Sequence, residues 1–225
     1  MPQFTPELQL RTLFALNATG RIVSTLEKDP SAGPAFALIR GRTSCAYAVH
    51  ADVPEELAGQ LIALAQSEPP VYDFKDDPVH ANRYTSLLPG RVDSGPAFTF
   101  PEVLPTPRDI VVVTNLSQLE RHFHGWTADE LPERAPILGL VEDGYPVSVC
   151  FCARRSAVAA EAGLDTAAGF RGRGLGPQVT AAWAHAVRSA GLLPIYSTSW
   201  SNDASLAVAR KLGLEMCASD WSLYD

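Results

Sequence analysis

A glycine-rich turn between a predicted strand and a predicted long helix limits the fold more than any other feature of this sequence. The turn spans residues 166–176, TAAGFRGRGLG, and glycine stands at three alternating positions, Gly172, Gly174 and Gly176. Glycine has no Cβ, so the backbone can approach a ligand closely. Free N–H groups at the N-terminus of a helix attract anions. The turn therefore predicts a phosphate-binding site at the start of the helix.

The segments around this turn alternate between strands and helices. The β-branched run at 109–114 is typical of a fully buried strand, and Glu142-Asp143-Gly144 between two apolar runs predicts a hairpin. The apolar spacing predicts strands at 109–114, 137–141, 147–153, 157–166, 193–198 and 214–223, and helices at 116–126, 174–190 and 203–212. The predicted order is β-α-β-β-β-α-β-α-β, an α+β fold with a mixed sheet.

The N-terminal part carries weaker signals. Its patterns predict a helix at 7–15, strands at 21–26, 35–40 and 44–49, and a helix that begins near Pro54. Eight of the 18 prolines lie between Pro69 and Pro107, which predicts a connector. We therefore expect an N-terminal α+β extension at 1–107 that ends in this proline-rich connector, followed by a second domain at 108–225.

Composition and charge argue against several classes of protein. The net charge of −7 argues against a general nucleic-acid binder, which needs a basic surface. No apolar run approaches the roughly 18 residues of a membrane-spanning helix, and the first residues lack the pattern of a secretion signal. The four cysteines have no metal-ligand spacing and suit a reducing compartment. We expect a cytoplasmic protein with no metal, no nucleic-acid partner and no membrane partner.

Three phosphate-binding motifs compete for the turn. The dinucleotide motif needs Gly-x-Gly-x-x-Gly, and the mononucleotide loop needs a lysine before Ser or Thr; the turn has neither. What remains is Arg-x-x-Gly-x-Gly, formed by Arg171, Gly174 and Gly176. Seven basic residues against three acidic ones between Arg154 and Lys211 give this acidic chain a basic region around the turn.

This spacing resembles the signature of the GNAT superfamily of acyl-CoA-dependent N-acetyltransferases, Gln or Arg-x-x-Gly-x-Gly or Ala, in the turn between the fourth strand and the third helix. Further along, Asn202-Asp-Ala-Ser205 and Leu212-Gly213 resemble the C-terminal motif of the family. Two matches at the right separation are more specific than one. The resemblance covers about residues 109–225 and implies a GNAT-like fold there.

The resemblance also implies a site for acetyl-CoA as co-substrate, without a metal. The turn would hold the pyrophosphate, and the end of the preceding strand would hold the pantetheine arm together with the C-terminal motif. The cofactor-binding residues so implied are Leu164, Asp165, Thr166, Arg171, Gly172, Arg173, Gly174, Leu175, Gly176, Asn202 and Ser205.

The family's chemistry needs a base for the acceptor amine and an acid for the thiolate. Glu161, on the predicted strand before the turn, is our candidate base; the alternative is an ordinary strand carboxylate that faces solvent or pairs with Arg154 or Arg155. The family often places a tyrosine acid seven residues after the asparagine, where this chain has Ala209. Tyr196, Ser205 or water are the remaining candidates for the acid.

These expectations define an N-acyltransferase that moves an acetyl group from acetyl-CoA to a primary amine by direct attack in a ternary complex. The acceptor would be a small-molecule or peptide amine, and the protein a monomer or homodimer. The alternative is a non-catalytic acyl-CoA-binding or protein-interaction module, which the alanine at position 209 favours.

Overall fold

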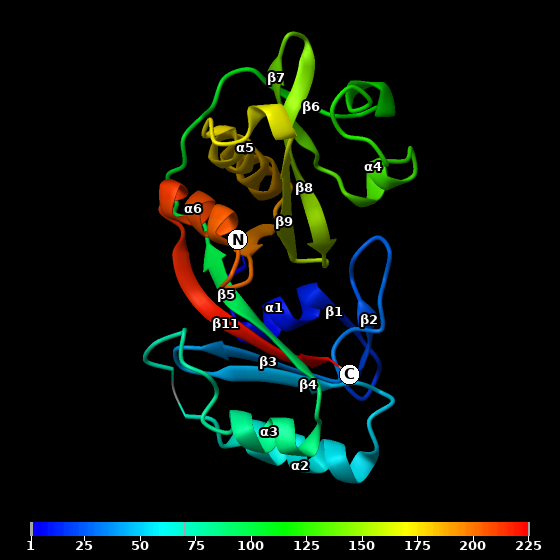
Figure 1. Cartoon of the computed structure of the whole chain (residues 1–225), viewed down its shortest axis with the longest axis vertical. Helices are drawn as coiled ribbons and strands as arrows, with labels where there is room; N and C mark the ends of the chain where they lie inside the picture. Colours follow the sequence, from blue (N-terminus) through cyan, green and yellow to red (C-terminus); the bar gives the residue numbers. More distant parts are fainter. Residues whose placement is uncertain (1, 70, 225) are drawn as a thin grey trace. The chain divides into compact units, whose positions relative to one another are not determined.

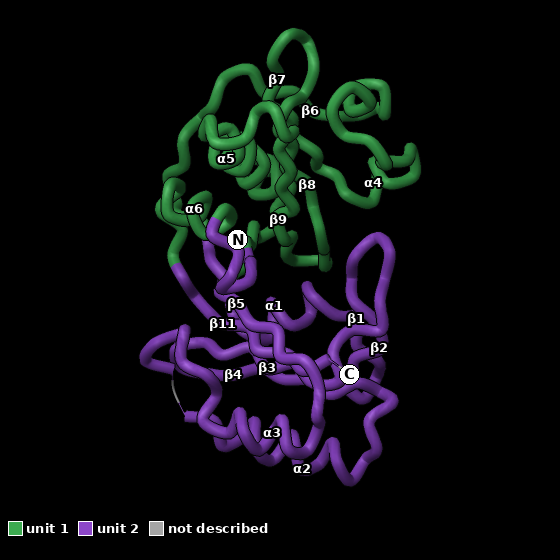
Figure 2. Tube along the Cα trace, viewed as in Figure 1, with its two compact units in different colours: residues 1–2, 100–196, 204–215 green, residues 3–99, 197–203, 216–225 purple. Residues whose placement is uncertain are grey.

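The computed structural model describes residues 2–69 and 71–224 of the chain. They form two compact units, each assembled from separate stretches of sequence (Figure 2). Unit 1 contains residues 100–196 and 204–215, and unit 2 contains residues 3–99, 197–203 and 216–224. The last strand of the chain thus belongs mainly with the N-terminal residues. The units do not follow a single cut near residue 107, and separate folding of 108–225 stays a prediction.

Unit 2 is a sheet with helices on both faces (Figure 1). Its elements are α1 (Pro6–Leu13), β1 (Phe14–Leu16), β2 (Ile22–Thr25), β3 (Phe36–Gly41), β4 (Cys45–Val49), α2 (Glu55–Gln66), α3 (Ala81–Leu87), β5 (Arg91–Thr99) and β11 (Glu215–Tyr224). The strand order is β4-β3-β11-β5, and β3 runs antiparallel to both β4 and β11. All of the helices and strands predicted before residue 68 are confirmed, within a few residues at their ends.

The core of unit 2 divides between the two faces of its sheet. Alternate residues of β3 point to opposite faces, so Phe36 and Leu38 pack with α2, whereas Ala37 and Ile39 pack with α1. Tyr84 of α3 joins the first cluster and its side chain is fully buried. Burial of β3 at all six positions follows from this coverage on both faces.

Unit 1 is built around a second, mixed run of strands. Its elements are β6 (Ile110–Val112), the 3₁₀ helix η1 (Leu116–Gln118), α4 (Glu130–Glu133), β7 (Leu138–Glu142), β8 (Tyr145–Arg155), β9 (Ala159–Thr166), the 3₁₀ helix η2 (Ala168–Phe170), α5 (Leu175–Ser189), β10 (Leu193–Ser197) and α6 (Asp203–Leu212). The strand order is β10-β9-β8-β7-β6, with β9 and β10 parallel and the other pairs antiparallel. The predicted α+β fold with a mixed sheet is confirmed, and so are the order of the strands and the two helices predicted after residue 173.

Helix α5 packs on β7, β8 and β9 and covers one face of unit 1. Its buried side includes Val179, Trp183 and Val187, as the apolar spacing predicted. Cys150 and Cys152 on β8 are buried free thiols. The hairpin is also confirmed, because Asp143 and Gly144 both adopt positive φ, at 50° and 81°.

Two sequence predictions in unit 1 are wrong. The helix expected at 116–126 is only the 3₁₀ helix η1 followed by turns, although Leu119 and Phe123 in this stretch are buried. Asn115 and Gln118 form a reciprocal cap around this short turn. The strand expected to be fully buried is β6, which lies at the end of the strand order and leaves Val112 59% exposed. An edge strand has a neighbour on one side only.

The predicted connector at 69–107 contains α3 and the nine-residue strand β5; its residue Pro70 lies outside the described residues. The pair Gly95-Pro96 reads as a turn in sequence, yet it lies inside β5. A Cβ on Gly95 would lie 1.7 Å from the carbonyl oxygen of Thr198, so only glycine fits there. The glycine marks a close approach of two backbones, which the sequence pattern does not distinguish from a turn.

Candidate cofactor and active site

The turn between β9 and α5 depends on two glycines. Gly172 and Gly174 both have φ of +76°, a left-handed conformation that other residues adopt at a cost of about 1–2 kcal/mol. A Cβ built on either glycine would meet no atom within 4 Å. The backbone conformation, and not crowding, therefore requires glycine, and the space beside both residues is open.

No side chain of the described residues caps the N-terminus of helix α5. Gly174 is the N-cap residue, no side chain bonds to the first turn, and no acidic residue lies in that turn. Pro177 has no N–H, so Leu175 and Gly176 carry the first-turn N–H groups that lack an intrahelical acceptor. The positive end of the helix dipole and these donors together suit an anion.

The two arginines of the turn contact groups on either side of it. The Arg171 Nε–H donates to the carbonyl oxygen of Thr166 at 2.9 Å, and its guanidinium lies 3.8 Å from an Asp165 carboxylate oxygen. The Arg173 guanidinium pairs with Glu142 at 2.8 Å and lies over the ring of Phe170. These bonds tie the turn to the ends of β9 and β7.

The end of β9 is fixed on one edge and unpaired on the other. Towards β8, the hydroxyls of Ser148 and Thr166 lie 2.8 Å apart. Towards β10, β9 pairs through Ala159, Ala160 and Glu161, and beyond Glu161 no pair joins the described residues 162–166 to β10. Backbone groups of Leu164, Asp165 and Thr166 thus lie on a stretch where β10 does not compete for hydrogen bonds. Leu164 also packs near Gly176, where an added Cβ would lie 3.2 Å from the leucine Cδ2.

The candidate base Glu161 lies in the core of unit 1. Its residue is 2% exposed, and its carboxylate forms an ion pair with Arg154, its antiparallel partner on β8. The Arg154 side chain is 25% exposed. Pairing with Arg154 was the alternative to a catalytic role for Glu161, and the structure contains that pair. The pair neutralises a buried charge that would otherwise destabilise the fold.

The candidate acids lie on β10 and α6. Tyr196 is 2% exposed, and its hydroxyl donates to the Ser205 carbonyl oxygen at 3.4 Å. Burial raises the pKa of Tyr196, so its phenol stays protonated at neutral pH. Ala209, at the position of the family tyrosine, is also buried and has no proton to give.

Asn202 immediately precedes α6 and belongs to unit 2. Its N–H donates to the carbonyl oxygen of Ser199 at 3.1 Å. The Leu212-Gly213 pair ends α6, since Gly213 has φ of +62° and the Leu214 N–H returns to the carbonyl of Ala209 at 3.0 Å. The two halves of the C-terminal motif thus lie at the two ends of α6.

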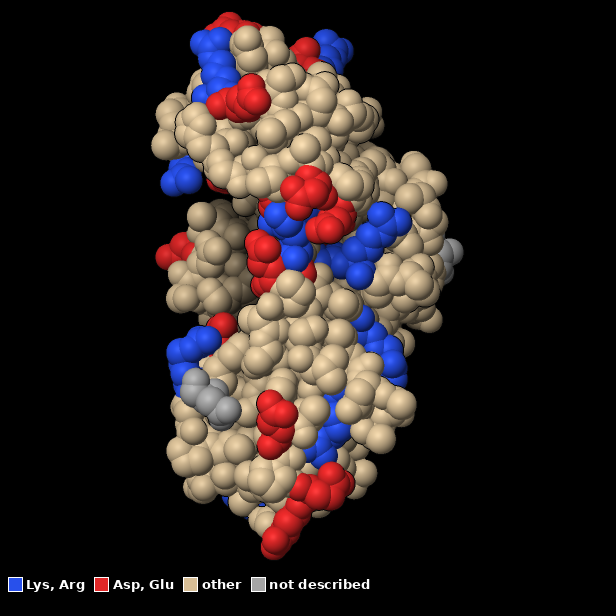
Figure 3. Space-filling view, turned by 90° about the vertical axis from the view of Figure 1, so that its right-hand side faces the viewer, with Lys and Arg blue, Asp and Glu red and all other residues tan. Residues whose placement is uncertain are grey.

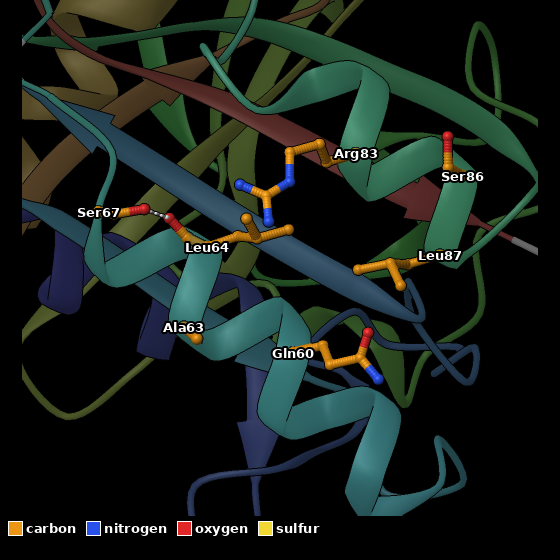
Figure 4. A pocket seen from close by; sticks show the side chains of 7 residues that line it. All are labelled: Gln60, Ala63, Leu64, Ser67, Arg83, Ser86 and Leu87. Carbon is orange, nitrogen blue, oxygen red and sulfur yellow. Dashed lines mark hydrogen bonds between the residues drawn. The ribbon is translucent and has the colours of Figure 1, made fainter.

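A separate groove lies in unit 2 between α2 and α3 (Figure 4), with a volume of about 480 Å³. Gln60, Leu64 and Arg83 are among the residues that line it. None of the predicted site residues is in it. Within the described residues, no group of three His, Cys, Asp or Glu side chains is placed to hold a metal, and no helix is long and apolar enough to cross a membrane.

Comparison with known proteins decides the family. Residues 138–224 match the family described as GNAT acetyltransferase. This segment of the chain belongs to the GNAT superfamily. The matched segment contains every cofactor-binding and catalytic residue predicted from the sequence. No curated protein matches the chain.

Solved GNAT structures are similar at low identity. A putative GNAT acetyltransferase from Novosphingobium aromaticivorans has 19% identity and a TM-score of 0.46, over 61% of this chain and 69% of that one. A GNAT-family acetyltransferase from Colwellia psychrerythraea has 13% identity and a TM-score of 0.49, over 92% and 84%. A GCN5-related N-acetyltransferase-like protein from Streptococcus suis has 18% identity and a TM-score of 0.47, over 89% and 88%.

Sequence reasoning missed three residues that fix the GNAT turn. Ser148 holds Thr166, Glu142 holds Arg173, and the Gln178 side chain donates to the Gly174 carbonyl at 3.3 Å. Gln178 lies one turn after Gly174, so its position in the sequence was a usable signal. Glu142 and Ser148 lie far from the turn in sequence, and only the pairing of β7, β8 and β9 brings them near.

Proposed function

We propose that this chain is an N-acetyltransferase that moves an acetyl group from acetyl-CoA to a primary amine. The observation that carries the proposal is the start of α5, where no side chain caps the helix and two left-handed glycines precede it. The main-chain N–H groups of residues 172–176 would hold the pyrophosphate, because preorganised donors at a helix N-terminus suit a diphosphate. The Arg171 N–H, at the start of the turn, donates to the Ala168 carbonyl instead. The described residues fit that ligand, since the space beside both glycines is open.

The unpaired edge of β9 supports the second half of the cofactor site. Backbone groups of Leu164 to Thr166 would bind the pantetheine amides and leave the thioester near the end of the β9–β10 pairing. Ser205, in the first turn of α6, would hold the same arm. The resemblance assigns Asn202 to this arm as well, and that assignment stays a prediction. A backbone N–H directed at the thioester oxygen would stabilise the charge that develops when the amine attacks.

We propose Glu161 as the group that receives the proton of the attacking amine. Its support is its position at the last β9–β10 pair, next to the stretch proposed for pantetheine. Arg154 would hold the carboxylate in place. We propose Tyr196 as the proton donor for the departing thiolate, because it is kept protonated by burial and its hydroxyl reaches the first turn of α6.

Thermal unfolding in the presence of ligands tests the cofactor assignment. Acetyl-CoA and CoA at about 100 times their Kd should each stabilise the protein by about 2.7 kcal/mol, which is a rise in Tm of several degrees. Pantetheine without the nucleotide diphosphate is the matched control and should do much less. An equal response to all three ligands would reject the pyrophosphate site.

Kinetics then test the two proton-transfer residues. General acid or base catalysis contributes about 10²–10⁴ in rate, so Glu161→Gln and Tyr196→Phe should each lower kcat by at least about 100-fold while leaving CoA affinity nearly unchanged. The urea midpoint is measured alongside, because Glu161→Gln also removes the partner of Arg154. A variant that loses stability but keeps kcat would show a purely structural residue.

A non-catalytic acyl-CoA-binding module is the second candidate. The buried Ala209 favours it, because this position lacks the hydroxyl that the family often uses there. Release of CoA thiol from acetyl-CoA across a panel of small and peptide amines separates the two proposals. Tight CoA binding with no thiol release above the solution rate would support the module.

A further inference from the structure

Arg171 is directed back at the strand that precedes the turn. Its Nε–H donates to the Thr166 carbonyl at 2.9 Å, which closes a ring of residues 166–171 between the end of β9 and Gly172. Its other contact, with Asp165, is 3.8 Å long, and the two side chains are 69% and 53% exposed. Exposed ion pairs of this length contribute little, so the Nε bond is the contact that matters.

This bond fixes the segment from which the α5 tip projects. Inside the ring, the Ala167 N–H donates to the Val147 carbonyl at 2.9 Å and the Phe170 N–H donates to the Ala167 carbonyl at 2.8 Å. Beyond the ring, Gly172 and Gly174 both have φ of +76°. Glycine can also adopt many other φ values when nothing holds the chain. A loop with such glycines presents its N–H groups in one arrangement only if its ends are held.

We infer that Arg171 is a positioning residue, which acts as a hydrogen-bond donor to Thr166 and not as a positive charge towards phosphate. The inference rests on the proposed function, because the N–H groups so positioned are those assigned to the pyrophosphate. Arg173 differs from Arg171, since it pairs with a carboxylate, Glu142, at 2.8 Å.

Side-chain chemistry separates the donor from the charge. The side-chain amide nitrogen of glutamine is bonded to Cδ, as the Nε of arginine is, so both nitrogens lie at the same distance along the side chain. The glutamine nitrogen can also donate a hydrogen bond, but it carries no charge. Lysine keeps the charge but has a methylene at that position. Methionine has neither. The variants Arg171→Gln, Arg171→Lys and Arg171→Met therefore test the two properties one at a time.

Two measurements are made on the full chain with each variant. The first is hydrogen exchange of the Ala167 and Phe170 amides without ligand, and the second is the Kd for CoA at 50 and 200 mM salt. We expect Arg171→Gln to stay within 3-fold of the unmodified protein in both and to keep its salt dependence. Arg171→Lys and Arg171→Met should exchange at least 10-fold faster and bind CoA at least 10-fold more weakly. Arg210→Gln, an equal loss of charge at an exposed position of α6, is the control.

The opposite ranking would overturn the inference. If Arg171→Lys behaves like the unmodified protein and Arg171→Gln loses CoA affinity together with part of its salt dependence, Arg171 acts through its charge. If Arg171→Met changes neither measurement, Arg171 positions nothing. If the unmodified protein does not bind CoA, the proposed function fails, and the exchange ranking alone decides whether Arg171 holds the turn.

Discussion

Helices α1 and α5 begin in opposite ways. The start of α1 is completed within the protein: Thr5 is extended, with φ −140° and ψ 153°, its hydroxyl oxygen accepts the Leu8 N–H at 3.1 Å, and Glu7 lies in the first turn. The start of α5 has a left-handed glycine as its N-cap, no side-chain acceptor for its first-turn N–H groups and no acidic residue. One helix start is capped by a side chain of the chain itself, and the other leaves its first-turn N–H groups open to solvent or a ligand.

The same contrast holds for the longer helices of the described chain. Helices α2 and α6 also carry acids in the first turn, Glu55 and Glu56 in α2 and Asp203 in α6. Among the described helices of eight residues or more, only α5 lacks such a charge. A carboxylate there stabilises a helix by about 0.3–1 kcal/mol, and α5 lacks this contribution. In the proposed function an anionic ligand would supply it.

A carboxylate placed at the α5 tip gives the largest expected effect. Gly174→Asp should raise the Kd for CoA at least about 100-fold, since two charges about 4 Å apart repel by about 4 kcal/mol near a protein surface. Gly174→Asn is the matched control, because it has the same size and also tolerates positive φ. Calorimetric titration with CoA measures both variants.

The same charge placed at α1 completes the comparison. Thr5→Asp exchanges one good N-cap residue for another, so neither the unfolding free energy nor the CoA affinity should change by more than about 0.5 kcal/mol. Equal CoA affinities for Gly174→Asp and Gly174→Asn would mean that no anion binds at the α5 tip.

The strands that pack against α5 and α1 each carry a largely buried thiol, and the two thiols should lower the stability at high pH in the same way even though the helix starts differ. Burial raises the pKa of Cys152, on the strand under α5, to about 11, and that of Cys217, packed in the α1 cluster, to about 12, from an ordinary value of 9.0. Above pH 9 the unfolded thiols lose their protons while the folded ones keep them. Stability therefore falls as the pH rises from 9 towards the folded pKa values.

Each thiol should account for a loss of about 1 kcal/mol between pH 8 and pH 10. Urea unfolding at the two pH values measures the loss, and Cys152→Ala and Cys217→Ala should each reduce the difference by that amount, whatever their own cost at pH 8. A pH dependence that neither variant alters would show that these thiols are not shielded from water in the folded protein.

Loss of the α1 cap should affect stability alone. Thr5→Ala removes the acceptor of the Leu8 N–H and should lower the unfolding free energy by about 1 kcal/mol. Thr5→Ser keeps the hydroxyl and should restore most of it. CoA affinity should be the same in all three proteins, and a change in it would link the start of α1 to the cofactor site.

The sequence predicted the local structure around the turn well. The turn at 166–176 and α5 are visible because glycine spacing and helical periodicity act over a few residues. The bonds that hold the turn were not visible, because Arg173 and Glu142 meet only after β7, β8 and β9 pair. The ion pair of Glu161 with Arg154 was predicted in part. The sequence offered it as an alternative to a catalytic role, and the cross-strand register of β8 and β9 places the two residues opposite each other.

The same difference explains the errors in the fold. Gly95 and Pro96 are turn residues by local rules, and only the Thr198 backbone, a hundred residues away, places them in β5. The last strand, β11, was predicted by its own pattern, but its pairing with β3 in unit 2 was not, because strand pairing between distant segments leaves no local signal.

The smallest expected effect comes from placing an acidic residue near the start of α5, as α2 has in its first turn. Gln178 lies at the end of the first turn, and its side chain donates to the Gly174 carbonyl at 3.3 Å. Gln178→Glu should stabilise the free protein by up to about 0.5 kcal/mol through the helix dipole, while the same charge should raise the Kd for CoA about 2–5-fold. Gln178→Ala, which loses the bond without adding charge, should lower both stability and affinity slightly. If Gln178→Glu raised or lowered both the stability and the CoA affinity, no anion would bind at the α5 tip. The difference between the starts of α1 and α5 would then be a matter of packing.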